Sequence, residues 1–215
     1  PLGGGCVADV RAIELDDGSR CVVKLASAGG LDVEAWMLRY LAARTRLPVP
    51  AVLYADDGML VLERVECDAG AIGPTGERDA ADHLAALHAV ECPRFGLERD
   101  TVIGGLAQPN PWSESWCGFF RDQRLLYMGR RALDVGAIPA PCFARLESLC
   151  ARLDRWIAEP PCASLIHGDV WAGNVLVHRA RVAAFVDPAI YFADPEIELA
   201  FVTLFATFGD EFFRR

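Results

Sequence analysis

The stretch "IHGDVWAGN" at residues 166–174, followed by "FVDP" at residues 185–188, decides the fold of this 215-residue chain. Asp169 precedes Asn174 by five residues, and Asp187 ends the apolar run that comes next. A carboxylate beside an attacking hydroxyl can act as a general base, while amide and carboxylate oxygens are ligands that Mg²⁺ accepts. The pattern predicts phosphoryl transfer from a nucleotide, with Asp169 as the base and Asn174 and Asp187 as Mg²⁺ ligands.

The residues expected to hold the nucleotide precede this loop. Gly3, Gly4 and Gly5 come before the first predicted strand and are expected to cover the phosphates, although such a run is also typical of a flexible tail. Lys24 is the only lysine in the chain, which suits a site that needs a compact ammonium rather than a planar guanidinium. We expect Lys24 to hold the α- and β-phosphates and Glu34, in the following helix, to orient it; an ordinary surface ion pair is the alternative.

Residues 1–65 are predicted to form a β-rich lobe with one helix. Two apolar, β-branched stretches flank the turn at residues 16–18, and two more flank Asp57-Gly58, so each set predicts a hairpin. Between them, residues 31–47 have helical periodicity, with Asp32 as the expected N-cap.

Residues 66–215 are predicted to be mainly helical, which makes the fold class α+β. Helices are expected at residues 77–90, 113–133 and 140–161. The last of these has Phe143, Leu146, Leu149, Leu153 and Trp156 roughly in phase, and Pro160-Pro161 as its end. Short strands and a further helix are expected around the opening motif.

Composition limits the possible partners and the compartment. The net charge of −9 argues against a general nucleic-acid binder, and no apolar run approaches the roughly 20 residues that cross a bilayer. The eight cysteines are scattered without a C-x-x-C pair, as expected for reduced thiols in a cytoplasmic protein. The chain starts without methionine and stops after an aromatic run, so we expect both ends to be cut; no oligomeric state is predicted.

Four stretches together resemble one enzyme family. They are "GGGCVADVRAI", "NPWSESWCGFFRDQRL", "LIHGDVWAGN" and "VDPAIYFADPEIELAF". The chain resembles the fructosamine (ketosamine) kinase family, within the aminoglycoside/choline kinase group of the two-lobed protein-kinase-like fold. Trp171, directly after the catalytic aspartate region, and the paired tryptophans Trp112 and Trp116 carry the narrower match.

The resemblance implies ATP-dependent phosphorylation of the sugar 3-hydroxyl of a ketosamine, either free or on a protein lysine, as deglycation repair. It places the adenine against backbone groups from Glu63 to Val65. Trp171, Trp112 and Trp116 are candidates for an aromatic platform under the sugar and its positive amine, with core packing as the alternative for the last two. Kinases for another alcohol (an aminoglycoside, choline or homoserine) and a silent nucleotide-binding pseudokinase remain alternatives.

Three further interpretations concern side chains near these motifs. His167 is expected to be structural rather than a proton carrier. Asp194, Glu196 and Glu198 are expected to cap and charge a helix N-terminus, with substrate-amine binding as the alternative. Cys6, in the glycine run, is a candidate redox switch, because a thiol beside phosphate-binding N–H groups has a lowered pKa.

Overall fold

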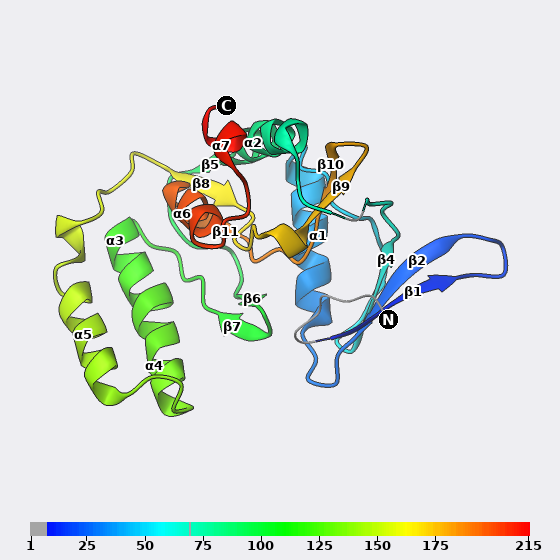
Figure 1. The fold of residues 1–215 in the computed structure, drawn as a ribbon. Coiled ribbons are helices and arrows are strands. Elements are labelled where there is room, and N and C mark those ends of the chain that lie inside the picture. Colours follow the sequence, from blue (N-terminus) through cyan, green and yellow to red (C-terminus); the bar gives the residue numbers. More distant parts are fainter. Residues whose placement is uncertain (1–7, 69) are drawn as a thin grey trace.

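The chain forms an antiparallel sheet with one helix, followed by a larger, mainly helical part (Figure 1). The structure is a computed structural model, and it describes residues 8–68 and 70–215. β4 ends at Glu63 and α2 begins at Pro74, so the connection between the two parts includes the expected boundary near residue 65. The expected mixture of sheet and helix is confirmed, whereas the exact domain limits stay a prediction.

The first sheet consists of two hairpins joined through their inner strands. Its strand order is β1-β2-β4-β3, and all pairs are antiparallel. α1 covers this sheet, with Ala35 and Leu38 packed against Leu60 and Leu62. Both predicted hairpins are confirmed. The bounds are β1 Asp9–Glu14, β2 Arg20–Leu25, α1 Leu31–Arg44, β3 Val52–Ala55 and β4 Met59–Glu63.

The start of α1 corrects the expected cap. Gly30, not Asp32, is the N-cap, and its φ of 91° lies in the left-handed region that favours glycine. The turn between β3 and β4 supplies the contacts: Gly30 N donates to Asp57 Oδ1 (2.8 Å), and Leu31 N donates to Asp57 O (3.2 Å). A tertiary contact therefore replaces the local cap that Asp32 would have provided.

The second part contains two further hairpins, a small sheet and the remaining helices. The small sheet has the order β11-β8-β5, and residues 167–174, called the catalytic loop below, follow the end of β8. α2 lies across its back, with Ala80, Leu84 and Leu87 buried as the helical spacing predicts. The bounds are α2 Pro74–His88, β5 Glu91–Cys92, β6 Thr101–Ile103, β7 Leu106–Gln108, α3 Trp116–Phe119, α4 Tyr127–Asp134, α5 Ala140–Cys150, β8 Ala163–Ile166, β9 Val175–His178, β10 Arg181–Phe185, β11 Tyr191–Ala193, α6 Glu196–Leu204 and α7 Asp210–Phe213.

Two of the predicted helices differ from their observed form. The helix expected at residues 113–133 is continuous, but the segment Phe120–Leu126 between α3 and α4 is a π-helix. The helix expected at 140–161 ends at Cys150 and gives way to a short 3-10 turn, which leaves Trp156 74% exposed. The predicted apolar phase holds for Phe143 and Leu153, which are buried, and is wrong for Leu149 and Trp156, which are exposed. Beyond α5 the carboxylate of Glu159 accepts the N–H of Trp116 (2.6 Å), which holds this part of the chain beside the start of α3.

A large apolar core joins α1, α2, the small sheet and α6. It holds the elements that carry the candidate site in fixed relative positions. Among the described residues, no helix is both long and apolar enough to cross a membrane.

Candidate active site

Lys24 is the residue before the last in β2 and is almost fully buried. Its ammonium donates to Glu34 Oε1 on α1 (2.7 Å) and to Asp187 Oδ1, which comes from the far end of the chain. Burial disfavours the charged ammonium, but the two carboxylates outweigh that effect and hold the pKa of Lys24 above its ordinary value. The predicted Lys24–Glu34 pair is thus a buried pair, not a surface one.

The catalytic-loop motif follows β8 and brings Asp169 next to Asn174. Asn174 Nδ2 donates both to the backbone oxygen of Asp169 (2.9 Å) and to its carboxylate Oδ2 (2.8 Å). Burial raises the pKa of Asp169 to about 6, with the negative charge of Asp187 adding to the rise and the hydrogen bond from Asn174 opposing it. A carboxylate with this pKa can accept a proton near neutral pH.

His167 is fully buried beneath the loop and contacts the ring of Phe185. Its Nδ1 accepts the N–H of Asp169 (3.3 Å), and burial holds its pKa below the ordinary value. A neutral imidazole in this position supports the loop, in agreement with the expected structural role.

Asp187 and Asn174 offer oxygens suited to Mg²⁺. Val186 N donates to Asn174 O (3.0 Å), so the hairpin of β9 and β10 brings these two residues together. The amide nitrogen of Asn174 is used by Asp169, which leaves its oxygen free for a metal. In the described part of the chain no group of three or more His, Cys, Asp or Glu side chains gathers as a metal cage. Magnesium fits nonetheless, because it takes one or two protein oxygens and completes its shell with phosphate and water.

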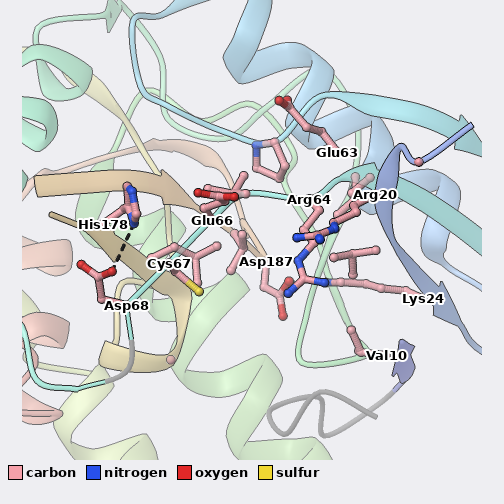
Figure 2. Close-up of a pocket in the computed structure, with 18 residues that line it drawn as sticks. Val10, Arg20, Lys24, Glu63, Arg64, Glu66, Cys67, Asp68, His178 and Asp187 are labelled. Atoms are coloured by element: carbon pink, nitrogen blue, oxygen red, sulfur yellow. Dashed lines mark hydrogen bonds and ion pairs between the residues drawn. The ribbon is translucent and has the colours of Figure 1, made fainter. Parts of the chain in front are cut away.

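A cavity of about 860 Å³ opens beside Lys24 and Asp187 (Figure 2). Its walls come from β1, β2, the connection after β4, and β9. Glu63, at the end of β4, and Arg64 and Val65, which follow it, all line the cavity, so the whole stretch expected to contact adenine lies in its wall. This volume falls in the range that holds small-molecule ligands, and a nucleotide placed here would meet the ammonium of Lys24.

Glu198 on α6 has a role in the site that the sequence analysis did not predict. Its side chain is 2% exposed, and its carboxylate accepts the N–H groups of Gly168 (2.6 Å) and His167 (3.4 Å). A further hydrogen bond joins it to His88 Nε2 (2.8 Å). Burial would raise the pKa of Glu198, but these donors outweigh it and hold the pKa below the ordinary value. The expected capping role is wrong for Glu198, which instead braces the catalytic loop from beneath.

The signal that could have found Glu198 is its spacing. It lies four residues before the buried Val202, on the inward side of an otherwise apolar helix, whereas Glu196 is exposed. A carboxylate on an inward face needs hydrogen-bond donors. Asp194 does cap α6, since its Oδ1 accepts the N–H of Glu196 (3.0 Å).

Replacing Glu198 with glutamine is expected to destabilise the fold and loosen the catalytic loop. The amide keeps one acceptor oxygen and turns an N–H₂ group toward a donor, so the free energy of unfolding should fall by about 2 kcal/mol, in the range for hydrogen bonds to a charged group. Urea unfolding measures this change. Glu196→Gln, on the exposed side of the same helix, is the control and should stay within about 0.5 kcal/mol of the unsubstituted protein. Equal effects of the two substitutions would contradict the bracing role.

The three candidate substrate tryptophans have different environments. Trp171 is 37% exposed, and its ring lies over Gly173, where an added Cβ would come within 2.3 Å of it. Trp112 is 36% exposed and packs beside Phe192. Trp116 is 2% exposed and stacks on Phe120 in the core, so the prediction that it contacts substrate is wrong and the core alternative holds. Its apolar environment at the start of α3 leaves no free ring face.

Gly3, Gly4, Gly5 and Cys6 lie outside the described residues. The phosphate-covering role of the glycines and the redox role of Cys6 therefore stay predictions.

Comparison with known proteins places the chain in a family. A family model described as fructosamine kinase matches residues 1–215. A probable ketoamine kinase of Synechocystis sp. is 32% identical over 228 residues, which cover 99% of this chain and 73% of that protein. The crystal structure of a candidate fructosamine-3-kinase from Haemophilus somnus 129PT superposes with a TM-score of 0.87 at 26% identity, covering all of this chain and 73% of that one.

The fold extends to a more distant group. An aminoglycoside phosphotransferase in a ternary complex with AMP-PNP and hygromycin B superposes with a TM-score of 0.66 at 20% identity, over 94% of this chain and 70% of that one. At that identity the likeness shows the fold alone, and the fold is the protein-kinase-like one expected from the sequence. With the family model matched from end to end, the chain belongs to the fructosamine kinase family.

Proposed function

We propose that the protein transfers the γ-phosphoryl group of ATP to the 3-hydroxyl of the sugar in a ketosamine. The observation that carries this proposal is the convergence of Lys24, Glu34 and Asp187 beside a nucleotide-sized cavity, with the Asp169–Asn174 pair on the neighbouring loop. Phosphoryl transfer depends on positioning and charge stabilisation, and this arrangement supplies both.

Each residue has a distinct role in the proposed reaction. Asp169 holds the acceptor hydroxyl and takes its proton as the oxygen attacks the γ-phosphorus, while the bond from that phosphorus to the β–γ bridging oxygen breaks. Lys24, fixed by Glu34, holds the phosphates. Asn174 keeps the Asp169 carboxylate oriented and, with Asp187, would hold Mg²⁺. When bound, the metal neutralises charge on the phosphates.

The acceptor class rests on the family and on the surface beside the loop. Relatives carry the name probable ketoamine kinase, and we take the acceptor to be a ketosamine, a sugar joined to an amine. Trp171 offers a partly exposed ring two residues beyond Asp169, and the net charge of −9 favours a positively charged amine. Trp112 is the second proposed contact. Glycated lysines, free or on proteins, fit this description.

An acceptor screen tests the proposal. The purified protein is supplied with ATP and Mg²⁺ and with fructosyl-lysine, ribulosyl-lysine, an aminoglycoside, choline or homoserine, and ADP release is measured. We expect ADP release with the two ketosamines at a rate at least tenfold above the other acceptors. Phosphorus-31 and proton NMR of the product should place the phosphate on the sugar 3-oxygen.

The other outcomes each select a different function. Faster turnover with an aminoglycoside, choline or homoserine would replace the ketosamine with that alcohol. ATP binding without ADP release on any acceptor would identify a silent nucleotide-binding protein and overturn the proposal.

A further inference from the structure

A network of buried polar side chains lies behind the catalytic loop, outside the residues assigned above. It starts at Gln108, the last residue of β7, which is 2% exposed. The amide Nε2 of Gln108 donates to Thr101 Oγ1 on β6 (2.9 Å) and to the backbone oxygen of Ala189 (3.0 Å). Both ends of this link are buried, so the two hydrogen bonds satisfy donors that water cannot reach.

Ala189 is the backbone unit that joins the metal-binding segment to the catalytic loop. Its N–H donates to His167 O (2.8 Å). Its carbonyl oxygen lies 2.2 Å from the point that a Cβ on Gly168 would occupy, so it fits against the loop only because residue 168 is glycine with a φ of 86°. Asp187 stands two residues earlier, itself at a left-handed φ of 55°. Gln108 therefore holds the carbonyl that sets how closely the Asp187 segment approaches the residues before Asp169.

The other residues of the network fix the position of Thr101, and so of the Gln108 amide. Asn110 Nδ2 donates to the same Thr101 Oγ1 (2.8 Å), and Asn110 Oδ1 accepts from Arg124 Nη2 (2.5 Å). The Arg124 guanidinium is buried, and among the described residues no carboxylate pairs with it; it stacks 3.9 Å from the ring centroid of Tyr191 on β11. Its other hydrogen bonds go to the backbone oxygens of Pro109 and Gln123, and it also lies 4.7 Å from the ring centroid of Phe119. Among the described residues its Nε has no hydrogen-bond partner.

A buried cation held by carbonyl oxygens and aromatic faces can be satisfied in only a few geometries. Arg124 lies in the π-helical segment, a form that is often found at functional sites. The network thus ties the β6–β7 hairpin, the π-helix and β11 into one unit, and Gln108 is the member that reaches the catalytic segment.

We propose that Gln108 is a positioning residue for phosphoryl transfer, which holds the Asp187–Ala189 segment against Gly168 so that Asp187 and Asp169 keep their separation. This proposal rests on the proposed function for its kinetic consequence, but not for its structural one. Gln108 is not one of the residues that line the cavity beside Lys24 and Asp187, so its loss should lower kcat and leave the Michaelis constant for ATP nearly unchanged.

Gln108→Met tests the proposal, because methionine has a similar length but donates no hydrogen bond. In the nucleotide-free protein, amide hydrogen exchange of Ala189 and Gly168 should become about tenfold faster, as expected when the buried hydrogen bond to the Ala189 oxygen is lost, while exchange in α2 stays unchanged. With ketosamine and ATP, kcat should fall about tenfold and the Michaelis constant for ATP should stay within about twofold. Gln123→Met makes the same side-chain change; Gln123 takes part in the network only through its backbone oxygen, which methionine keeps, so this control should show neither effect.

Thr101→Val provides a second variant if Gln108→Met fails to fold. This substitution keeps the hydrogen bond from Gln108 to the Ala189 oxygen and removes the hydroxyl of Thr101 that helps to fix the Gln108 amide. The faster exchange and the lower kcat should therefore both appear, but with smaller size. Faster exchange throughout the protein with an unchanged kcat per folded molecule would show a merely structural role and overturn the proposal. If the unsubstituted protein phosphorylates no acceptor, the proposed function fails, and the local exchange at Ala189 and Gly168 still decides whether Gln108 positions this segment.

Discussion

Asp169→Asn is expected to lower kcat by about 10²–10⁴-fold, the contribution typical of a positioned general base, while ATP binding stays near normal. Asparagine keeps the oxygen that accepts from Asn174 Nδ2 and nearly the same shape, so the loop should hold its conformation. What the substitution removes is the ability to take the proton of the acceptor hydroxyl. Steady-state turnover with a ketosamine, together with calorimetric nucleotide binding, measures the two effects separately.

Asp194→Asn is the matched control for this prediction. Asp194 follows β11 and caps α6, a role that asparagine performs equally well. Its turnover should stay within about twofold of the unsubstituted protein, since no transition-state interaction is lost. Turnover of Asp169→Asn within the same range would remove Asp169 from the chemistry.

Lys24→Met is expected to abolish phosphate positioning and also to lower the free energy of unfolding by about 3–5 kcal/mol, the cost of leaving one partner of a buried ion pair alone. The side chain of Glu34 is 14% exposed and would keep an unpaired charge, whereas Asp187, at 37%, can be hydrated. For a chain of this size the midpoint of thermal unfolding should fall by roughly 6–20 °C. Thermal and urea unfolding measure the change.

The double substitution Lys24→Met with Glu34→Gln separates stability from function. Removing both charges should recover most of the lost free energy of unfolding, because no buried carboxylate is left without a partner. Activity should not return, since the phosphates still lack their ammonium. Arg20→Met, at an exposed cation on the same strand, is the control and should change stability by less than about 0.5 kcal/mol. A stable Lys24→Met protein would contradict a charged, buried pair.

Local sequence determined much of this molecule. The two hairpins follow from Asp-Gly turns between β-branched strands, and α2 follows from its helical spacing, because both depend on contacts within a few residues. The Asp169–Asn174 hydrogen bond is local in the same sense, since five residues of one loop contain it. The lone lysine of the chain is buried beside Glu34, where a compact ammonium was expected.

Tertiary structure alone decided the rest. The Gly30 cap depends on Asp57, the position of the chain after α5 on the contact of Glu159 with Trp116, and the catalytic loop on Glu198, which lies 30 residues beyond Gly168. Trp112 and Trp116 belong to the same sequence motif, and nothing in that motif distinguishes them. In the structure Trp112 is partly exposed, whereas Trp116 is buried in the core. Periodicity reports which side of an element is apolar, but not which other element covers that side. The donors that a buried carboxylate or amide meets are therefore fixed only when distant segments pack together.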